Sequence, residues 1–413
     1  MQKVKIITLG CRFNFDESEI SKAIISCMEP KNDVVLVNTC SVTHEAERQS
    51  KQAVRKAIRE NPNATVIVTG CAAKTSKDYF ENLDGVFKVI QNDKKEDIEE
   101  YIAIPHISDF KNLTQNEILN RARLFEDKTR AFLQVQNGCD HFCSYCIVPF
   151  TRGRSRSVTL SEIIERIHRF VELGFKEVVL SGIDITSYGK DLNGTNLTDV
   201  IKNIIDKFPN LRVRISSIDP KGITDDLLDL ITSEQQIMPH FHLSIQSGSN
   251  DVLKMMKRRH SREDVIDICN KIRDKRSDVV FGCDFIAGFP SETELMFNDT
   301  LNLIDEANLS LMHVFPYSPR RGTLAASMVQ LPNSIITDRA KRLRIKSKEA
   351  KQKLFKNLVG TKMQGIVEQM SGTTSIGKTD NFLPFIINKN LPENSLITFD
   401  VISYTDDFLH GAV

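Results

Sequence analysis

The sequence lacks both a long apolar run and a strong net charge. No stretch of its 413 residues approaches the ~18–20 apolar residues that span a bilayer. The opening MQKVKIITLGC has no long apolar core of the kind found in a signal peptide, and it indicates a strand instead. The formal net charge is only +1, so any affinity for nucleic acid must come from local patches. We therefore expect a cytoplasmic protein with no membrane span.

Cysteine, in contrast, is well represented, with nine residues. In a reducing compartment cysteines are more often metal ligands or nucleophiles than disulfide partners. The chain is also longer than one hydrophobic core usually serves, so we expect two or three domains.

The order of apolar and helical stretches predicts an α/β protein with three domains. Over residues 1–100, β-branched runs alternate with helical segments, which indicates an N-terminal domain on a parallel sheet. Residues 101–130 are polar and irregular and are interpreted as a linker. Over 131–357 six further strand–helix units fit an open (β/α)6 barrel with its working edge at the strands' carboxyl ends. It ends in a long basic helix at about 334–358, and the short strands of 358–413 predict a small β-barrel.

Three cysteines lie close together just after the first strand expected in the second domain: Cys139, Cys143 and Cys146. One interpretation is a zinc site in which His141 is a fourth ligand. Structural zinc sites, however, usually combine two pairs of ligands, and no second pair follows here. Three thiolates on a short loop suit an iron–sulfur cubane whose fourth iron has no protein ligand and can be chelated by a small molecule. The spacing therefore favours an iron–sulfur cluster.

A second set of three cysteines is spread over the N-terminal domain. Cys11, Cys40 and Cys71 each follow an apolar strand, at spacings of 29 and 31 residues. Any one of them alone would be interpreted as a buried core thiol. Because the carboxyl ends of parallel strands meet at one edge of a sheet, the three together predict a shared ligand, again a cluster with one uncommitted iron. The polar residues expected beside this site are Asn14, Asn38 and Glu17.

Small and polar residues gather where the later barrel strands are expected to end. The segments are SGID, RISSIDP, HLSIQSGSN, FIAGFPSET and FPYSPRRGTLA. Glycine and serine in any single segment could be turn formers only. Five such ends in register indicate a ligand site on the edge where barrel enzymes bind substrate. The remaining Cys27, Cys269 and Cys283 lie inside helical or strand patterns and are interpreted as core residues.

The C-x₃-C-x₂-C motif, with Tyr145 at its aromatic position, resembles the signature of the radical-SAM superfamily. The resemblance implies that Cys139, Cys143 and Cys146 hold a [4Fe–4S] cluster. Its open iron would bind S-adenosylmethionine, and reduction would cleave this to a 5′-deoxyadenosyl radical. The residues that the resemblance places in the S-adenosylmethionine pocket are Ser181, Gly182, Arg214, Ser216, Gln246 and Gly288.

Over essentially its whole length the sequence resembles the methylthiotransferase family. The segments that carry this resemblance are LGCRFNFDESE, VNTCSVT, GCAAK, QNGCDHFCSYCIVPFTRGRSRS, SSIDP, HLSIQSGS and GKTDNFLPF. The last lies where the family has its RNA-binding TRAM barrel. The resemblance implies a second [4Fe–4S] cluster at Cys11, Cys40 and Cys71, where one S-adenosylmethionine methylates a held sulfur. A second S-adenosylmethionine molecule yields the radical that removes hydrogen from the substrate carbon. A radical is needed because an unactivated C–H bond has no useful acidity.

Branches of this family differ in their substrate, which is isopentenyl-adenosine or threonylcarbamoyl-adenosine of tRNA, or an aspartate of a ribosomal protein. HLSIQSGS is most similar to the threonylcarbamoyl branch, since the isopentenyl branch has HLP in place of HLS. This implies methylthio transfer to C2 of N6-threonylcarbamoyladenosine at tRNA position 37, with an electron donor such as a flavodoxin or ferredoxin and a sulfur source as further partners. A rival of another class is a non-enzymatic, zinc-stabilised RNA-binding protein.

Contacts with RNA are expected at three local basic patches. These are residues 339–356, residues 257–262, and the arginines Arg152, Arg154 and Arg156. Each alone could be a solvated surface, whereas together they could follow the phosphates of a folded RNA. From residue 361 onward there are three lysines against six acids. In the last domain we therefore expect aromatic or backbone contacts around DNFLPF to contribute more than charge.

Overall fold

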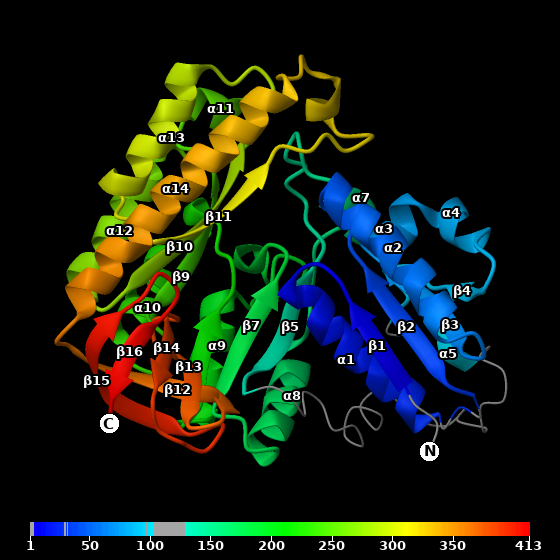
Figure 1. Cartoon of the computed structure of the whole chain (residues 1–413), viewed down its shortest axis with the longest axis horizontal. Coiled ribbons are helices and arrows are strands. Elements are labelled where there is room, and N and C mark those ends of the chain that lie inside the picture. Colours follow the sequence, from blue (N-terminus) through cyan, green and yellow to red (C-terminus); the bar gives the residue numbers. More distant parts are fainter. Residues whose placement is uncertain (1–3, 29, 31, 96, 103–128) are drawn as a thin grey trace. The chain divides into compact units, whose positions relative to one another are not determined.

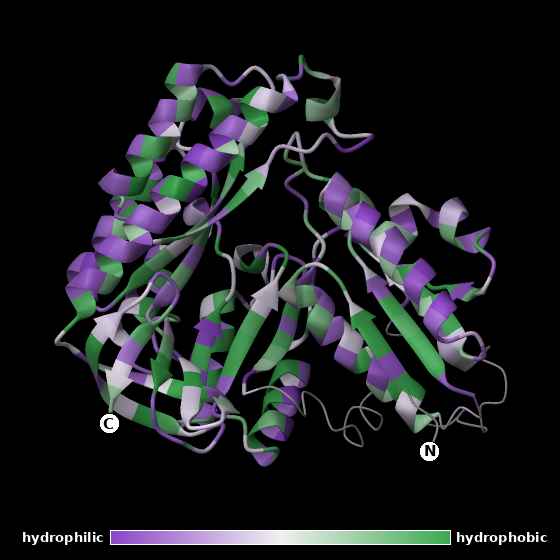
Figure 2. Cartoon of the chain, viewed as in Figure 1, coloured by the Kyte–Doolittle hydropathy of each residue, from purple (hydrophilic) through white to green (hydrophobic). Residues whose placement is uncertain are grey.

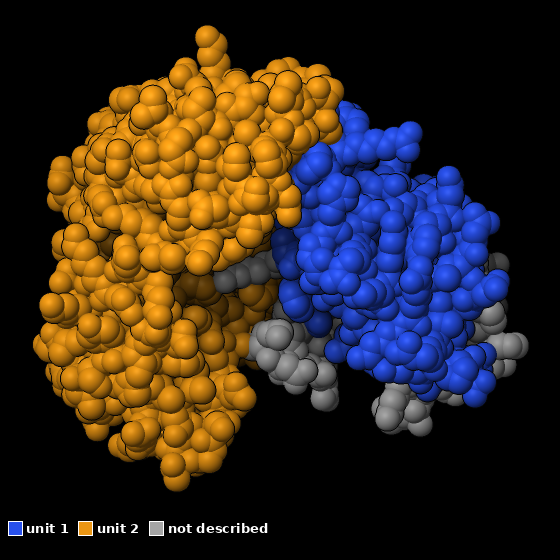
Figure 3. Space-filling view, turned by 45° about the horizontal axis from the view of Figure 1, so that its top comes forward, with its two compact units in different colours: residues 1–126, 137–156, 318–323 blue, residues 127–136, 157–317, 324–413 orange. Residues whose placement is uncertain are grey.

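The computed structural model describes residues 4–28, 30, 32–95, 97–102 and 129–413. Most of the linker expected at 101–130 lies outside these residues. The chain divides into two compact units, shown in Figure 3. Unit 1 consists of residues 1–126, 137–156 and 318–323, and unit 2 consists of residues 127–136, 157–317 and 324–413. All six cysteines predicted to be ligands fall in unit 1.

Unit 1 contains a parallel sheet with the strand order β1-β2-β3-β4. The strands are β1 (Val4–Thr8), β2 (Val34–Thr39), β3 (Thr65–Gly70) and β4 (Val86–Val89). The two central strands are buried throughout, and their Val and Ile residues suit strands covered on both faces (Figure 2). The helices of this unit among the described residues are α1 (Arg12–Cys27), α2 (His44–Glu60), α3 (Cys71–Thr75), α4 (Lys77–Glu81), α5 (Glu99–Ile102) and α7 (Val148–Arg152).

Local signals and an apolar face together fix α2 against this sheet. The helix begins after Thr43, whose hydroxyl accepts a hydrogen bond from the Ala46 amide at 3.1 Å. Its buried Val54 and Ala57 pack into a core with Val35 and Val66 of the sheet. The predicted N-terminal α/β domain is confirmed.

Unit 2 contains the second alternation of strands and helices (Figure 1). The strands are β5 (Ala131–Asn137), β6 (Arg156–Ser157), β7 (Glu177–Gly182), β8 (Arg212–Ile215), β9 (His240–Gln246), β10 (Val280–Ala287) and β11 (Leu311–Pro316). They form two sheets, β6-β5-β7-β8 and β11-β10-β9. Parallel bridges Val213–Ile237 and Ile218–Leu243 connect the two sheets. Six parallel strands in this order confirm the predicted open barrel.

Helices follow the barrel strands and end in one long helix. They are α8 (Leu160–Glu172), α9 (Leu197–Lys207), α10 (Asp225–Ser233), α11 (Asn250–Met255), α12 (Arg262–Lys275), α13 (Glu294–Glu306) and α14 (Asn333–Leu358), with short 3₁₀ turns η1 (Ile185–Ser187), η2 (Pro220–Gly222) and η3 (Leu324–Ser327). Asn196 and Ser261 form capping boxes at the starts of α9 and α12. The last helix confirms the one predicted at about 334–358.

The C-terminal strands close into a five-stranded barrel with the order β12-β13-β14-β16-β15. They are β12 (Lys362–Ser371), β13 (Thr374–Thr379), β14 (Pro384–Ile387), β15 (Leu396–Tyr404) and β16 (Leu409–Ala412). Its interior contains Phe385 and Phe399, which pack in one core with Phe355 of α14. The predicted small β-barrel is confirmed.

Within unit 2, a buried cluster of charged side chains lies where the small C-terminal barrel meets the open barrel. Glu177 is fully buried and accepts hydrogen bonds from Arg130 at 2.6 Å, Arg214 at 2.7 Å and Arg212 at 3.1 Å. Burial raises the pKa of Glu177, but the charges of Arg214 and Arg130 outweigh burial and lower that pKa to about 2. Arg212 also binds Asp380, just after β13, at 2.7 Å.

The DNFLPF segment belongs to the same contact. The Phe382 ring lies 4.7 Å from the guanidinium carbon of Arg214 and 5.2 Å from the His240 ring. Asn381 and Leu383 are buried. These side chains hold the small barrel against the open barrel, and contact of the segment with RNA stays a prediction.

No helix in the described part of the chain is both long and apolar enough to cross a membrane.

Candidate functional site

The cysteines of the N-terminal domain meet at one edge of the sheet in unit 1. Cys40 and Cys71 directly follow β2 and β3, and Cys11 lies between β1 and α1. The thiols are close enough for Cys71 and Cys11 to act electrostatically on Cys40. Burial, and to a smaller extent these two neighbours, raise the pKa of Cys40 to about 11. The Cys40 thiol is therefore hard to ionise unless a cation lies beside it, and a cluster of iron ions would supply that charge.

Two glycines let the backbone pass close enough to form this edge. Gly10 and Gly70 directly precede Cys11 and Cys71, and both have φ of +95°. A Cβ atom on Gly10 would lie 2.8 Å from the Cys40 sulfur, and one on Gly70 would lie 2.3 Å from the Thr39 carbonyl oxygen. Only glycine tolerates both the dihedral angle and the lack of space. The parallel strands and these two glycine turns together bring the three cysteines close to one another.

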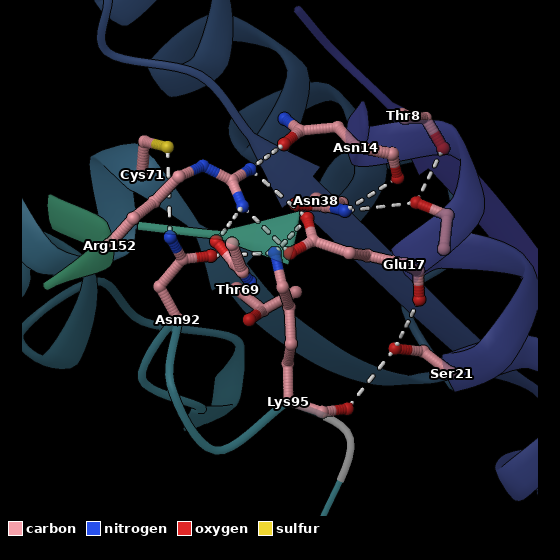
Figure 4. A network of polar contacts seen from close by, with 12 residues as sticks. Thr8, Asn14, Glu17, Ser21, Asn38, Thr69, Cys71, Asn92, Lys95 and Arg152 are labelled. Atoms are coloured by element: carbon pink, nitrogen blue, oxygen red, sulfur yellow. Dashed lines mark hydrogen bonds and ion pairs between the residues drawn. The ribbon is translucent and has the colours of Figure 1, made fainter. Parts of the chain in front are cut away.

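Polar residues behind the trio form a buried network (Figure 4). Asn14, Asn38 and Glu17, which the sequence placed here, are each 1% exposed or less. The Asn38 side chain donates to the Asn14 carbonyl at 3.0 Å, and the Asn14 side chain donates to the Leu9 carbonyl at 2.6 Å. These bonds fix the turn that carries Cys11, because they tie it to β2.

Three further members of this network were not assigned to it from the sequence. Lys95 forms an ion pair with Glu17, and Asn92 donates to the Cys71 sulfur at 3.7 Å. Arg152, interpreted from the sequence as part of an RNA-binding patch, is 3% exposed and binds Glu17 at 2.8 Å. That interpretation is wrong for Arg152, because a guanidinium at this depth cannot reach a phosphate backbone. No sequence pattern separates it from its exposed neighbour Arg154.

The second trio lies on the loop between β5 and α7, also in unit 1. Cys139, Cys143 and Cys146 are all partly exposed. The Cys146 amide donates to the Cys143 carbonyl at 3.0 Å, and the Cys139 amide donates to the Gly153 carbonyl at 3.1 Å. The His141 amide lies 3.5 Å from the Cys139 sulfur and donates to it. A short loop held by its own amides presents three reachable thiols, which is the donor set that an iron–sulfur cubane takes.

The predicted S-adenosylmethionine residues fall at strand ends in unit 2. Ser181 and Gly182 end β7, and Ser216 follows β8. The Ser216 hydroxyl is buried and has no hydrogen-bond partner among the described residues. A bound ligand could therefore form a hydrogen bond with it. Gln246, at the end of β9, has φ of +74°, a strained conformation that is found at functional sites. All four positions lie at strand ends, where the sequence placed them, and their role in binding S-adenosylmethionine stays a prediction.

Arg214 and Gly288 are differently placed. Arg214 binds Glu177 and the Asp380 carbonyl, at 2.7 and 3.0 Å. The Gly288 amide donates to Glu292 at 3.0 Å, and a Cβ there would lie 2.8 Å from a side-chain carbon of Ile336 in α14. Both residues have packing contacts within unit 2, and their assignment to the S-adenosylmethionine pocket stays a prediction.

Two imidazoles and a carboxylate share one face of the β11-β10-β9 sheet. His242 Nε2 lies 2.9 Å from Asp284 Oδ1, and His313 Nδ1 lies 3.2 Å from the same oxygen. The His242 and His313 bonds hold the pKa of Asp284 below its usual range although burial raises it. Such a trio can bind a divalent ion or the polar part of a substrate. Sequence reasoning missed it because its members are spread over 72 residues.

Several residues of the two other predicted basic patches are paired with carboxylates. Arg339 is buried against Glu292 at 2.8 Å. The further pairs are Arg342–Glu294, Lys346–Asp305, Lys348–Asp406, Arg258–Asp219 and Arg262–Glu306. The interpretation as a phosphate-binding residue is wrong for Arg339, because its side chain is buried, and the nearby carboxylates weaken it for the other paired residues. Of the remaining cysteines, Cys269 and Cys283 are buried, as predicted, and Cys27 is partly exposed.

Comparisons with known proteins agree with this geometry. Residues 133–304 match the family model of the Radical SAM superfamily, and residues 3–91 match the model described as Uncharacterized protein family UPF0004. A tryptophan-binding radical S-adenosylmethionine methyltransferase, TsrM from Kitasatospora setae, has a similar fold, with a TM-score of 0.54 over 76% of this chain and 74% of that chain at 12% identity. Fold and cysteine loop thus define the chain as a radical-SAM enzyme.

Similarity to curated proteins is more specific. The chain is 41% identical to the threonylcarbamoyladenosine tRNA methylthiotransferase MtaB of Rickettsia prowazekii, over 98% of this chain and 96% of that protein. It is 34% identical to the Bacillus subtilis MtaB, over 94% of this chain and 90% of that protein. A tRNA-2-methylthio-N(6)-dimethylallyladenosine synthase of Staphylococcus saprophyticus is 32% identical, over 91% of this chain and 79% of that protein. The chain belongs to the MtaB family of threonylcarbamoyladenosine tRNA methylthiotransferases, whose cofactors are S-adenosylmethionine and two [4Fe–4S] clusters.

Proposed function

We propose that this chain transfers a methylthio group to C2 of N6-threonylcarbamoyladenosine at position 37 of tRNA. The observation that carries the proposal is the pair of cysteine trios in unit 1, each of which supplies three thiols and would leave one iron of a bound cluster without a protein ligand. The 41% identity to an MtaB protein over nearly the whole chain supports the same activity.

Cys139, Cys143 and Cys146 would hold one cluster, and Cys11, Cys40 and Cys71 the other. When bound, these groups and S-adenosylmethionine supply a carbon radical that opens a C–H bond and a sulfur donor that carries a methyl group. The protein's part is to hold and shield them. Ser181, Gly182, Ser216 and Gln246 are proposed to bind S-adenosylmethionine, on the strength of the unpartnered Ser216 hydroxyl and the strained Gln246 backbone.

The polar cluster on β9, β10 and β11 supports a polar substituent on the substrate base. A dimethylallyl group offers no hydrogen-bonding atom, whereas a threonylcarbamoyl group has carbonyl, hydroxyl and carboxylate oxygens. The His313 side chain is 66% exposed while Asp284 fixes its ring, so it can bind such an atom without first being ordered. We expect His313→Leu to lower kcat/KM by about tenfold, the effect of one hydrogen bond, when nucleosides from variant-treated tRNA are quantified.

The domains are proposed to be 1–100, 131–357 and 358–413, with the third a TRAM-like barrel. We also propose a cytoplasmic location and, as further partners, a flavodoxin- or ferredoxin-type electron donor and a separate sulfur source. The reducing environment that six ligand thiols require supports this.

Nucleoside analysis tests the reaction and the substrate together. A strain without the gene should lose 2-methylthio-N6-threonylcarbamoyladenosine from its tRNA by mass spectrometry and accumulate the unmethylthiolated nucleoside. Loss of the dimethylallyl product instead would favour the function of the 32% identical relatives. An unchanged nucleoside profile with an altered ribosomal-protein mass would favour the third branch. Zinc without iron or sulfide in anaerobically purified protein would indicate the non-enzymatic rival.

A further inference from the structure

Arg152 connects the segment of the second trio to the site of the first, within unit 1 (Figure 4). It ends α7, six residues after Cys146. Its guanidinium donates to Glu17 at 2.8 and 3.1 Å and to the Asn14 side chain at 2.6 Å. The ring of Phe13 lies 4.4 Å from the guanidinium carbon. Asn14 and Glu17 both belong to the helix that begins directly after Cys11.

A second cation completes the network. Lys95 is 1% exposed, forms an ion pair with Glu17 and donates to the Asn92 side chain at 2.6 Å. The Asn92 amide in turn donates to the Cys71 sulfur at 3.7 Å and to the Thr151 carbonyl at 3.2 Å. The residue next to Arg152 is therefore also tied to the first site.

The charges of the described residues in this network do not cancel. Two buried cations, Arg152 and Lys95, face one buried carboxylate, Glu17, which leaves one positive charge among these three side chains. An unmatched buried cation is costly unless an anion lies near it. Arg152 interacts electrostatically with Cys71 and Cys11. A [4Fe–4S]²⁺ core with three thiolates carries a net charge of about −1, so the network fits a cluster at these cysteines.

We propose that Arg152 is a positioning residue that sets the reduction potential of the cluster held by Cys11, Cys40 and Cys71. This inference depends on the N-terminal cluster of the proposed function. A fixed cation stabilises the reduced and more negative state of a cluster, so Arg152 keeps the potential higher than the thiolates alone would. Arginine cannot lose its proton in a protein, so this charge is permanent. The segment that carries one trio thus tunes the other.

Redox titration of the N-terminal cluster alone tests the proposal. In the full-length chain Cys139, Cys143 and Cys146 are replaced by Ala, the remaining cluster is reconstituted anaerobically, and its reduction is followed by electron paramagnetic resonance. Arg152→Gln should lower the ratio of reduced to oxidised cluster at the parent's midpoint about tenfold, a shift of about −59 mV for a one-electron couple. Arg152→Lys should titrate close to the parent's potential, because lysine keeps the positive charge.

Two further variants separate charge from structure. Arg154 is two residues away, 77% exposed and paired with Asp140 at 2.8 Å, so Arg154→Gln is the matched control and should leave the potential unchanged. Glu17→Gln removes the anion but keeps the shape. It should move the potential in the positive direction, opposite to Arg152→Gln, a reversal of sign that loosened packing would not produce.

The outcomes distinguish failure of the proposed function from failure of the role proposed for Arg152. If the single-cluster parent binds no iron, the proposed function fails as well. If the parent binds iron and Arg152→Gln titrates at the parent's potential, only the role of Arg152 is overturned. Should Arg152→Gln fail to retain iron, a negative shift in Glu17→Gln, or a negative shift of about 59 mV in Arg154→Gln, overturns the proposal.

Discussion

The two cysteine trios offer the same three thiols but are assembled in different ways. Cys139, Cys143 and Cys146 lie on one loop whose own amides hydrogen-bond its carbonyls and a sulfur. The members of the other trio come from three strand ends, and their approach needs two glycines at φ of +95° and a buried network behind them. A local motif carries its geometry within a few residues, whereas the dispersed trio depends on the whole sheet.

Removing one cysteine from each trio should have the largest effect and separate their roles. Cys143→Ala is expected to abolish S-adenosylmethionine cleavage, whereas Cys40→Ala should leave cleavage intact and abolish methylthiolation. Each variant should lose about four of about eight irons. Chromatography of 5′-deoxyadenosine, nucleoside mass spectrometry and iron analysis measure these quantities. Equal loss of both activities in the two variants would contradict the division of roles.

A change at a glycine should affect only the dispersed trio. In Gly70→Ala the new Cβ would lie 2.3 Å from a backbone oxygen, so we expect loss of the N-terminal iron with 5′-deoxyadenosine formation retained. Gly174→Ala is the matched control, since Gly174 has φ of +85° but nothing within 4 Å of the added Cβ. It should cost about 1–2 kcal/mol of stability and no iron. Equal iron content in the two variants would show that the close approach at Gly70 is unimportant.

The cluster of charged side chains in unit 2 should affect stability without affecting either trio. Glu177→Gln is expected to destabilise unit 2 by about 3–5 kcal/mol, because buried arginines lose their anion, with iron content unchanged. The pKa of Glu177 is about 2 in the folded chain and about 4.3 when unfolded. Its stabilisation is therefore complete above about pH 4.3 and is lost as the pH falls towards 2. Thermal unfolding between pH 7 and 3 should show a smaller acid loss in the variant; an identical pH profile would argue against this role.

The smallest effect is expected for a cysteine outside both trios. Cys269 is buried in α12, and burial raises the pKa of its thiol to about 12, as for a core residue. Cys269→Ala should retain all iron and full activity and lower stability by about 1 kcal/mol. Iron analysis and a thermal melt are sufficient, and any loss of iron would make Cys269 part of a cluster site.

Much of the fold was predictable because its signals are local. Alternating apolar runs predicted the parallel sheet and the six barrel strands, and short strands predicted the closing barrel. The six candidate ligands were also found from spacing and strand position. Four predicted pocket positions, among them Ser216 and Gln246, lie at or directly after a strand end, as the sequence placed them, and their binding of S-adenosylmethionine stays a prediction. The contacts of Arg214 could not be predicted, because its partners Glu177 and Asp380 lie 37 and 166 residues away.

The sequence by itself determined the class of the protein, the order of its domains and the two trios, since period, spacing and motif are properties of neighbouring residues. Only the tertiary structure decided which charges are buried. Arg152 and Arg154 are alike in the sequence, but one meets Glu17, 135 residues away, and the other is exposed to solvent. Burial depends on contacts between distant segments, and burial determines whether an arginine can bind a phosphate or tune a metal site.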